Sequence, residues 1–149
     1  GPCYIRLGRA AVPVFYGDDD EIILGRANTV RDGKDVTVIA TGIMVSDAVE
    51  AAGRLAEEGI DVRVIDIHTV KPLDEEAAQE TKAIVTAEEH SVIGGLGSAV
   101  AEVVVKNAPV KMAMVGQHDT YGESGKPDEL RKKYGMTAAD IVAAVKSVL

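Results

Sequence analysis

Four short apolar runs, each followed by a stretch with helical spacing, restrict the possible folds of this chain more than any other feature. The runs are rich in Val, Ile and Ala and are predicted to be strands at Val36–Ala40, Val62–Ile67, Ala83–Ala87 and Val110–Val115. Helices are predicted from a cap at Ser46 to a stop at Gly59, after Pro72, and over Ala99–Asn107, Asp128–Tyr134 and Thr137–Val148. Strands that alternate with helices predict right-handed crossovers and a mostly parallel sheet with helices on both faces. The predicted fold class is therefore α/β.

The first 34 residues do not continue this alternation. Cys3–Leu7 is a short β-prone run, and we expect the strands that pair with it to lie upstream of Gly1. Residues 10–34 are predicted to be an irregular connector that ends in an edge strand near Ile22–Val30 and a turn at Asp32-Gly33. The regular α/β domain is therefore expected to occupy residues 35–149.

Composition restricts the binding partners and the compartment. The 149 residues carry a formal net charge of −8, which opposes sequence-independent contact with nucleic acid or an anionic membrane. Cys3 is the single cysteine, so neither a disulfide framework nor a thiolate metal cluster is expected. No apolar run reaches the roughly 20 residues of a membrane-spanning helix, and the first residues do not read as a signal peptide. We expect a single cytoplasmic domain.

A glycine-rich loop is the first candidate for ligand binding. Gly94–Ser98 follows a predicted strand and opens a predicted helix, where backbone N–H groups can bind an anion. The loop lacks the Lys-Ser/Thr of a nucleotide-binding P-loop, and Val100 stands where a dinucleotide fingerprint needs its third glycine. Two interpretations stay open: an anion-binding or interface loop, or a tight turn that lets helix and strand pack closely. The residues concerned are Gly94, Gly95, Gly97 and Ser98.

Acidic residues and histidines also follow the predicted strands. Glu88, Glu89 and His90 come directly after one strand and could serve acid–base chemistry, a pH-sensitive contact or an interface. Asp66 with His68 forms a similar pair, as does His118 with Asp119. The three histidines lack the spacing of metal ligands, so we expect no metal site. No serine has an assigned base and Cys3 has no activating partner, so no catalytic residue is predicted in this chain.

Four segments, taken in order, are similar to a known family. They are Gly1–Arg9, Asp35–Gly42, Thr86–Ser98 and Asp119–Gly125, and Pro127–Leu130 and Tyr134–Thr137 follow them. Together they resemble the carboxy-terminal part of the transketolase group of thiamine diphosphate enzymes. The resemblance covers nearly the whole chain and is strongest to the carboxy-terminal half of a split, prokaryotic-type transketolase, which is encoded as two subunits.

The resemblance implies a three-layer α/β/α domain of five strands, one of them antiparallel. It implies that residues 1–9 end the upstream pyrimidine-binding domain and that residues 35–149 are the family's last domain. In the intact enzyme, thiamine diphosphate and Mg²⁺ would be bound by the preceding domains and not by this chain. The last domain would pack on the second domain, or on a separate amino-terminal subunit, and help to build a dimer. The isolated chain would then be inactive, although the intact enzyme would transfer ketol units in the pentose phosphate pathway.

Arg9 is the one residue for which the resemblance implies contact with substrate. It matches the arginine that binds the phosphate of the sugar-phosphate substrate in the family. A planar guanidinium suits this role because it donates two parallel hydrogen bonds to phosphate oxygens. We therefore expect Arg9 to bind substrate in the intact enzyme.

Two other interpretations stay open. Within the same superfamily, the chain could end a 1-deoxyxylulose-5-phosphate synthase or the β subunit of a 2-oxo acid dehydrogenase, although Gly122–Gly125 and Tyr134–Thr137 favour transketolase. In another functional class, it could be a free-standing anion-binding regulatory module built around Gly94–Ser98.

Overall fold

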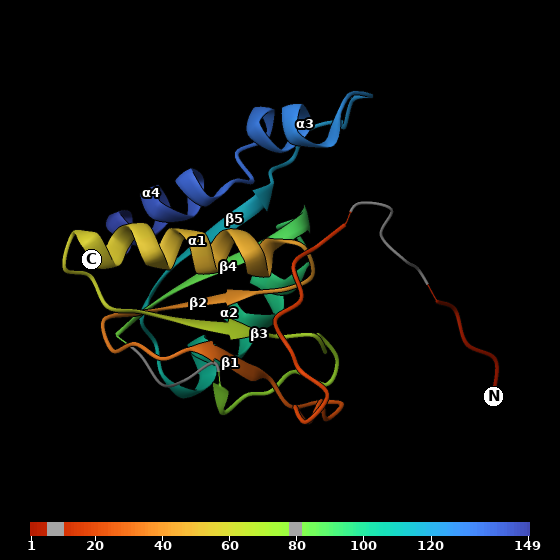
Figure 1. Ribbon diagram of the computed structural model, residues 1–149, viewed down its shortest axis with the longest axis horizontal. Helices are drawn as coiled ribbons and strands as arrows, with labels where there is room; N and C mark the ends of the chain where they lie inside the picture. The colour runs from red at the N-terminus through yellow and green to blue at the C-terminus, as the bar shows by residue number, and fades with distance from the viewer. Residues whose placement is uncertain (6–10, 78–81) are drawn as a thin grey trace.

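The computed structural model describes residues 1–5, 11–77 and 82–149, which form one five-stranded sheet with helices packed against it (Figure 1). The strands are β1 (Asn28–Arg31), β2 (Val36–Ala40), β3 (Val62–Asp66), β4 (Ala83–Ser91) and β5 (Lys111–Gln117). The helices within the described ranges are α1 (Met44–Glu57), α2 (Leu96–Asn107), α3 (Pro127–Lys133) and α4 (Ala138–Val148). Among the described residues, no helix is both long and apolar enough to cross a membrane.

The strand order across the sheet is β1-β3-β2-β4-β5. Neighbours from β3 to β5 pair in parallel, with Val38 of β2 opposite Val64 on one side and Val85 on the other. At the other edge β1 pairs antiparallel with β3. The predicted α/β class with a mostly parallel five-stranded sheet and one antiparallel edge strand is therefore confirmed.

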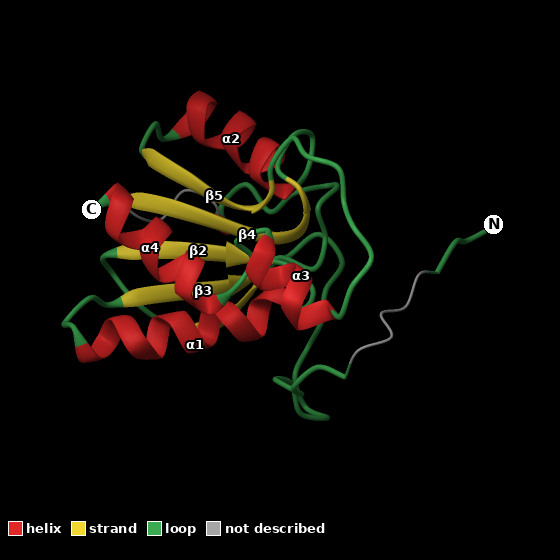
Figure 2. Ribbon diagram, turned by 90° about the horizontal axis from the view of Figure 1, so that it is seen from above, coloured by secondary structure: helices red, strands yellow, loops and turns green. Residues whose placement is uncertain are grey.

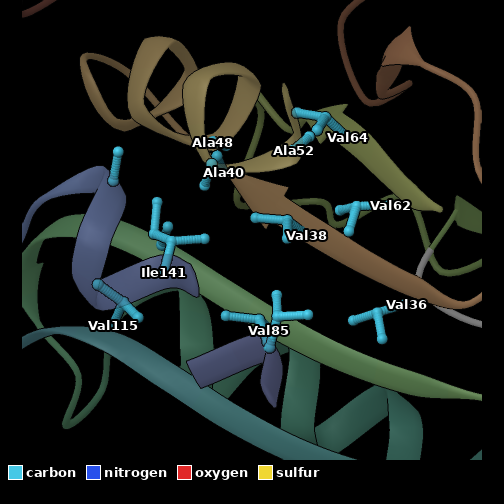
Figure 3. Packing of buried hydrophobic residues seen from close by; sticks show 14 of the residues in the cluster. Val36, Val38, Ala40, Ala48, Ala52, Val62, Val64, Val85, Val115 and Ile141 are labelled. Carbon is cyan, nitrogen blue, oxygen red and sulfur yellow. The ribbon is translucent and has the colours of Figure 1, made fainter. Parts of the chain in front are cut away.

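The two faces of the sheet bury separate apolar cores because successive side chains of a strand point to opposite faces. On one face Val38, Val64 and Val85 pack beneath α1 and α4, and Ile141 of α4 reaches into the same core (Figure 3). On the other face Ile39 and Ile84 pack against α2. The sheet thus forms the middle of three layers, as Figures 1 and 2 show from two directions.

The edge strand is shorter than predicted. It spans Asn28–Arg31 and not Ile22–Val30, because the chain turns just before it. Arg26 N–H donates to Ile23 O at 3.0 Å, and Gly25 adopts a left-handed φ of 85°, which closes this turn and breaks the extended backbone. Pairing with β3 can begin only after the turn.

Ser46 is not the cap of α1, contrary to the prediction. The helix begins earlier because the residues after β2 already turn: Met44 N–H donates to Thr41 O, and Ile43 in the N-cap position has helical angles. Ser46 therefore lies inside the first turn, where its hydroxyl donates to Ile43 O at 2.8 Å. The stop near Gly59 is confirmed by its left-handed φ of 81° just after the helix.

Two further predicted elements are only partly described. Cys3, Tyr4 and Ile5 are exposed and lie outside the five strands, and Arg6 and Leu7 lie outside the described residues. The predicted pairing of Cys3–Leu7 with strands upstream of Gly1 stays a prediction. After Pro72, Asp74 accepts a hydrogen bond from Ala77 N–H in a turn, and residues 78–81 of the predicted helix lie outside the described residues.

Truncation of Ile141 tests the main core. Its side chain is fully buried, so Ile141→Ala should lower the free energy of unfolding by about 2–5 kcal/mol through lost apolar contacts and a residual cavity. Val105→Ala on α2, where Val105 is 71% exposed, should change it by less than about 0.5 kcal/mol. Urea denaturation measures both values, and similar losses for the two variants would contradict the assigned core.

Candidate functional site

One edge of the sheet collects the loops that carry ligands in other open α/β folds. The strands β2, β3, β4 and β5 are parallel, so their carboxyl ends lie along this edge, and Figures 1 and 2 show their arrowheads pointing to the same side. The amino-terminal segment, defined as residues 11–27, runs past the same side. We call this region the carboxyl edge: the amino-terminal segment together with residues 41–43, 67–77, 92–95 and 118–126.

The carboxylate of Glu88 occupies the amino-terminal end of α2. Glu88 is only 2% exposed, and its two oxygens accept hydrogen bonds from Leu96 N–H at 2.7 Å and Gly97 N–H at 2.8 Å. A negative charge is favourable here because the first N–H groups of a helix are unpaired and carry the positive end of its dipole. These two amides are therefore bound to an internal carboxylate and are not free for an external anion.

The glycines of this loop permit close packing around Glu88. A Cβ on Gly95 would lie 2.2 Å from a Glu88 oxygen, and one on Gly97 would lie 2.7 Å from the Met114 sulfur. The rest of the loop is also bonded internally, because Gly94 N–H donates to Ser98 Oγ at 2.9 Å. These contacts favour the tight-turn interpretation of the loop over a preformed anion site.

Glu89 and His90 do not join Glu88 in a common cavity. Both are exposed, whereas Glu88 points into the domain. His90 Nδ1 lies 3.0 Å from Ser91 O and 4.0 Å from Glu88 Oε2. The structure therefore brings Glu88 and His90 near each other but gives them opposite surroundings, one in the core and one in solvent.

The amino-terminal segment is fixed to the loop after β3 by hydrogen bonds that short-range sequence patterns did not indicate. Tyr16 Oη donates to Asp66 Oδ2 at 2.7 Å. Ala27 N–H donates to Asp74 Oδ2 at 2.9 Å. Of these partners the sequence marked only Asp66 as a candidate, because Tyr16 lies 50 residues away and no local pattern links the two.

Burial and acidic neighbours change the acidity of Tyr16. Desolvation, the hydrogen bond to Asp66 and the negative charges of Asp66 and Asp20 raise the pKa of Tyr16 above its ordinary range. The phenol is therefore held as a neutral donor to the carboxylate.

Several exposed apolar side chains belong to the loops of the carboxyl edge. Val14 is 90% exposed and Tyr121 is 97% exposed. Three more belong to the same region: Val12, Val70 and Ile93. Exposed apolar side chains of this kind are available for contact with another protein.

Arg9 lies outside the described residues, so its predicted role stays a prediction. Within residues 1–5, 11–77 and 82–149, no group of three or more His, Cys, Asp or Glu side chains could hold a metal ion. Mg²⁺ prefers several oxygen ligands in octahedral geometry. The described residues therefore do not fit the metal that accompanies thiamine diphosphate.

A pair of glycine variants tests the packing around Glu88. Gly95→Ala should lower the free energy of unfolding by about 1–3 kcal/mol, because the new Cβ would collide with Glu88 and with Ser91 O. Gly53→Ala, within α1 and with open space around it, should raise it by about 0.5–1 kcal/mol. Chemical denaturation of both variants should give changes of opposite sign, and a neutral Gly95→Ala would contradict the close approach.

The contact between Tyr16 and Asp66 predicts a pH dependence. At about pH 7 the wild type should exceed Tyr16→Phe in the free energy of unfolding by about 1 kcal/mol. Because the folded pKa of Tyr16 is raised, this advantage is complete below the unfolded value of about 10 and decreases as pH rises above it. Urea denaturation between about pH 7 and 11 measures the difference, and a constant difference would contradict the contact.

Comparison with known proteins identifies the family. Residues 25–141 match the family model described as transketolase, C-terminal domain. The chain is 51% identical to the 6-deoxy-6-sulfo-D-fructose transketolase subunit of Clostridium sp., over 99% of this chain and 47% of that relative. It is 46% identical to an apulose-4-phosphate transketolase subunit of Phocaeicola vulgatus, over 91% of this chain and 45% of that relative.

A solved structure agrees with these matches. The structure described as split gene transketolase, inactive beta4 tetramer, is similar with a TM-score of 0.90 and 49% identity, over 95% of this chain and 48% of that one. The chain spans about half the length of the curated relatives it matches. The resemblance found in the sequence is thus confirmed, and the chain belongs to the transketolase C-terminal domain family.

Proposed function

We propose that this chain is the carboxy-terminal domain of one subunit of a split transketolase and that its own task is assembly. The subunit's remaining portion would precede this domain, since the family model describes a C-terminal domain and the chain covers only 47% of its Clostridium relative. A separate amino-terminal subunit would complete the enzyme. The activity of the assembled protein would be transfer of a two-carbon ketol unit between sugars.

The exposure of apolar side chains in several loops of the carboxyl edge carries the proposal. Val14, Ile93 and Tyr121 come from three different segments, and each is more than half exposed. Removing such surface from water is favourable by about 25 cal/mol per Å². A protein that covers these side chains would therefore bind this edge favourably, and this binding would not require a cofactor in this chain.

The polar groups of the edge support assembly over independent chemistry. Glu88 is hydrogen-bonded to α2 and Asp66 to Tyr16, so neither carboxylate is free to act as a base. We propose that thiamine diphosphate and Mg²⁺ are bound by the rest of the enzyme, which would supply the carbanion chemistry of the cofactor. The isolated chain would then have no activity.

Arg9 would be this chain's contribution to substrate binding. A phosphate or sulfonate group on the sugar would suit its guanidinium, and the relatives are named for sugars of both kinds. We keep the division of the chain at residues 1–9, 10–34 and 35–149 as part of the proposal. The first part would belong to the neighbouring pyrimidine-binding domain, where Arg9 could reach a substrate.

The assembly would contain more than one copy of the subunit. The similar solved structure is described as a tetramer, and the transketolase resemblance implies a dimer of active units. Nucleic acid is not a proposed partner, because the net charge of −8 repels it.

A second candidate is the end of a 1-deoxyxylulose-5-phosphate synthase. The enzyme of that name from Desulforudis audaxviator is 40% identical over 99% of this chain, and this chain covers 24% of it. The product of the assembled enzyme distinguishes the two: ketol transfer to an aldose supports transketolase, and formation of deoxyxylulose phosphate supports the synthase. A free-standing anion-binding module is disfavoured, because Glu88 already occupies the amides at the start of α2.

Mixing tests the proposal directly. This chain should form a complex with the amino-terminal portion of its subunit, supplied as a separate polypeptide, and ketol transfer should appear only after the cofactor-binding parts are added. Calorimetry measures the complex and a coupled assay measures the transfer. Tyr121→Asp should weaken the complex roughly tenfold by placing a charge in the interface.

Leu149→Asp serves as the matched control, because Leu149 is also exposed but lies at the chain end opposite the carboxyl edge in Figure 1. Its complex should keep the wild-type affinity. Ketol transfer by the isolated chain, or failure of the wild type to form a complex, would contradict the assembly role.

A further inference from the structure

The outer edge of β5 forms one border of the sheet, and no described strand pairs with it. β5 ends the strand order β1-β3-β2-β4-β5, and Figure 2 shows it at one side of the sheet. Lys111 is exposed and the next three residues of β5 are partly exposed, whereas Val115 is buried. Backbone N–H and C=O groups on an accessible border of this kind can pair with a further strand.

The two borders of the sheet differ in their protection against such pairing. β1 spans only Asn28–Arg31, its register with β3 shifts between Thr29 and Arg31, and its last residue is charged. Short length, irregular register and charge all prevent an edge strand from pairing with another chain. β5 spans seven residues, has no charged residue after Lys111 and keeps a regular register with β4 as far as Val115. Of the two borders, β5 is therefore the one suited to strand pairing.

The alternation of the strand assigns the backbone groups that face this border. Val92, which follows β4, donates its N–H to Gln117 O at 3.0 Å, so the backbone groups of Gln117 face the β4 side. In an extended strand, successive residues direct their N–H and C=O groups to opposite sides. Counted back from Gln117 along β5, Met112 and Met114 direct these groups away from β4. A further strand would form its hydrogen bonds with these two residues.

Charge and burial restrict how a second copy of β5 can lie antiparallel along this border. A two-fold axis at Lys111 would place two ammonium groups opposite each other, which is unfavourable. An axis beyond Met112 would draw in Val115, which is only 5% exposed. With the axis at Met112, each Lys111 faces Ala113 of the other copy and the like charges stay apart. The paired stretch is then residues 110–114, each of which is exposed or partly exposed.

We propose that the outer edge of β5 pairs antiparallel with the same edge of a second copy of this chain, with Met112 on the two-fold axis. The inference rests on the proposed function, in which the assembly contains more than one copy, and it names the surface of that contact. Each outward N–H would find a carbonyl of the other copy, and the two sheets would continue into one. Met112 packs partly against the core beneath α2, and its counterpart would cover the part that is still exposed.

Met112→Pro tests this pairing, with Met112→Leu as the matched control. Proline removes the N–H that points to the border and blocks the approach of a second strand, but it removes no hydrogen bond to β4. Self-association of this chain, measured by sedimentation velocity over a range of concentrations, should weaken at least roughly tenfold in Met112→Pro. Met112→Leu keeps the N–H and a similar volume, so its association should stay within about twofold of the wild type.

A cysteine cross-link tests the same contact without proline. Cys3 is exposed and is first replaced by serine, so that no other thiol is present. Met112→Cys then places two cysteines opposite each other with about 5.5 Å between their Cα atoms, a separation that a disulfide spans. Oxidation with diamide should give a covalent dimer on non-reducing electrophoresis. Thr29→Cys, at an exposed position of β1, is the control and should give little dimer.

The outcomes separate this inference from the proposed function. The inference is overturned if the wild type stays monomeric, if folded Met112→Pro associates as strongly as the wild type, or if Thr29→Cys cross-links faster than Met112→Cys. Binding of the amino-terminal portion, measured separately, would still support the assembly role in each of these cases. Self-association through β5 without binding of that portion would support the pairing and contradict the proposed function. If circular dichroism shows Met112→Pro to be unfolded, the cross-link decides alone.

Discussion

The buried carboxylate of Glu88 at the start of α2 is the interaction on which the carboxyl edge depends. It joins the end of β4 to the helix that follows and lets α2 begin at Leu96, three residues before the predicted Ala99. It also explains why the loop needs glycine at 95 and 97, since a Cβ at either position would collide with Glu88 or with the neighbouring strand. The same contact uses the amides that would otherwise form an anion site. The buried Glu88 carboxylate thus sets the geometry of this loop and leaves these two amides unavailable for binding an external anion.

The parts of the fold predicted from sequence are those governed by local pattern. Runs such as Val36–Ala40 are buried on both faces, so they read as continuous apolar stretches, and each was predicted within a few residues of its position. Errors arose where a tertiary contact changes a local preference. Ser46 is a favourable cap residue, but the turn at Thr41–Ile43 starts α1 before it. Glu88 was recognised as a candidate for acid–base chemistry, but its pairing with amides eight and nine residues later depends on how helix and strand pack.

The candidate site was less predictable than the fold, for a related reason. Its contacts join residues far apart in sequence, such as Tyr16 with Asp66 and Gly25 with Thr69. An irregular segment with no periodicity carries no signal that says which loop it lies against. The sequence indicated that Asp66 and His68 are polar residues at the end of a strand, where ligands bind in α/β folds. It did not indicate that Asp66 would accept a hydrogen bond from Tyr16 of the amino-terminal segment, or that Nε2 of His68 would be buried without a partner among the described residues.

These contacts support the proposal that the partner of this edge is a protein and not a small ligand. Three carboxylates of this region are hydrogen-bonded within the domain: Glu88 to α2, Asp66 to Tyr16 and Asp74 to Ala27. The edge exposes apolar side chains, such as Val14 and Tyr121, together with charged ones, such as Asp18 and Glu123. A protein surface would gain from burying the exposed apolar side chains and could pair with the charged ones around them. Because Glu88, Asp66 and Asp74 are hydrogen-bonded within the domain, we propose that the exposed apolar side chains, and not these carboxylates, provide the contact of this edge with a partner.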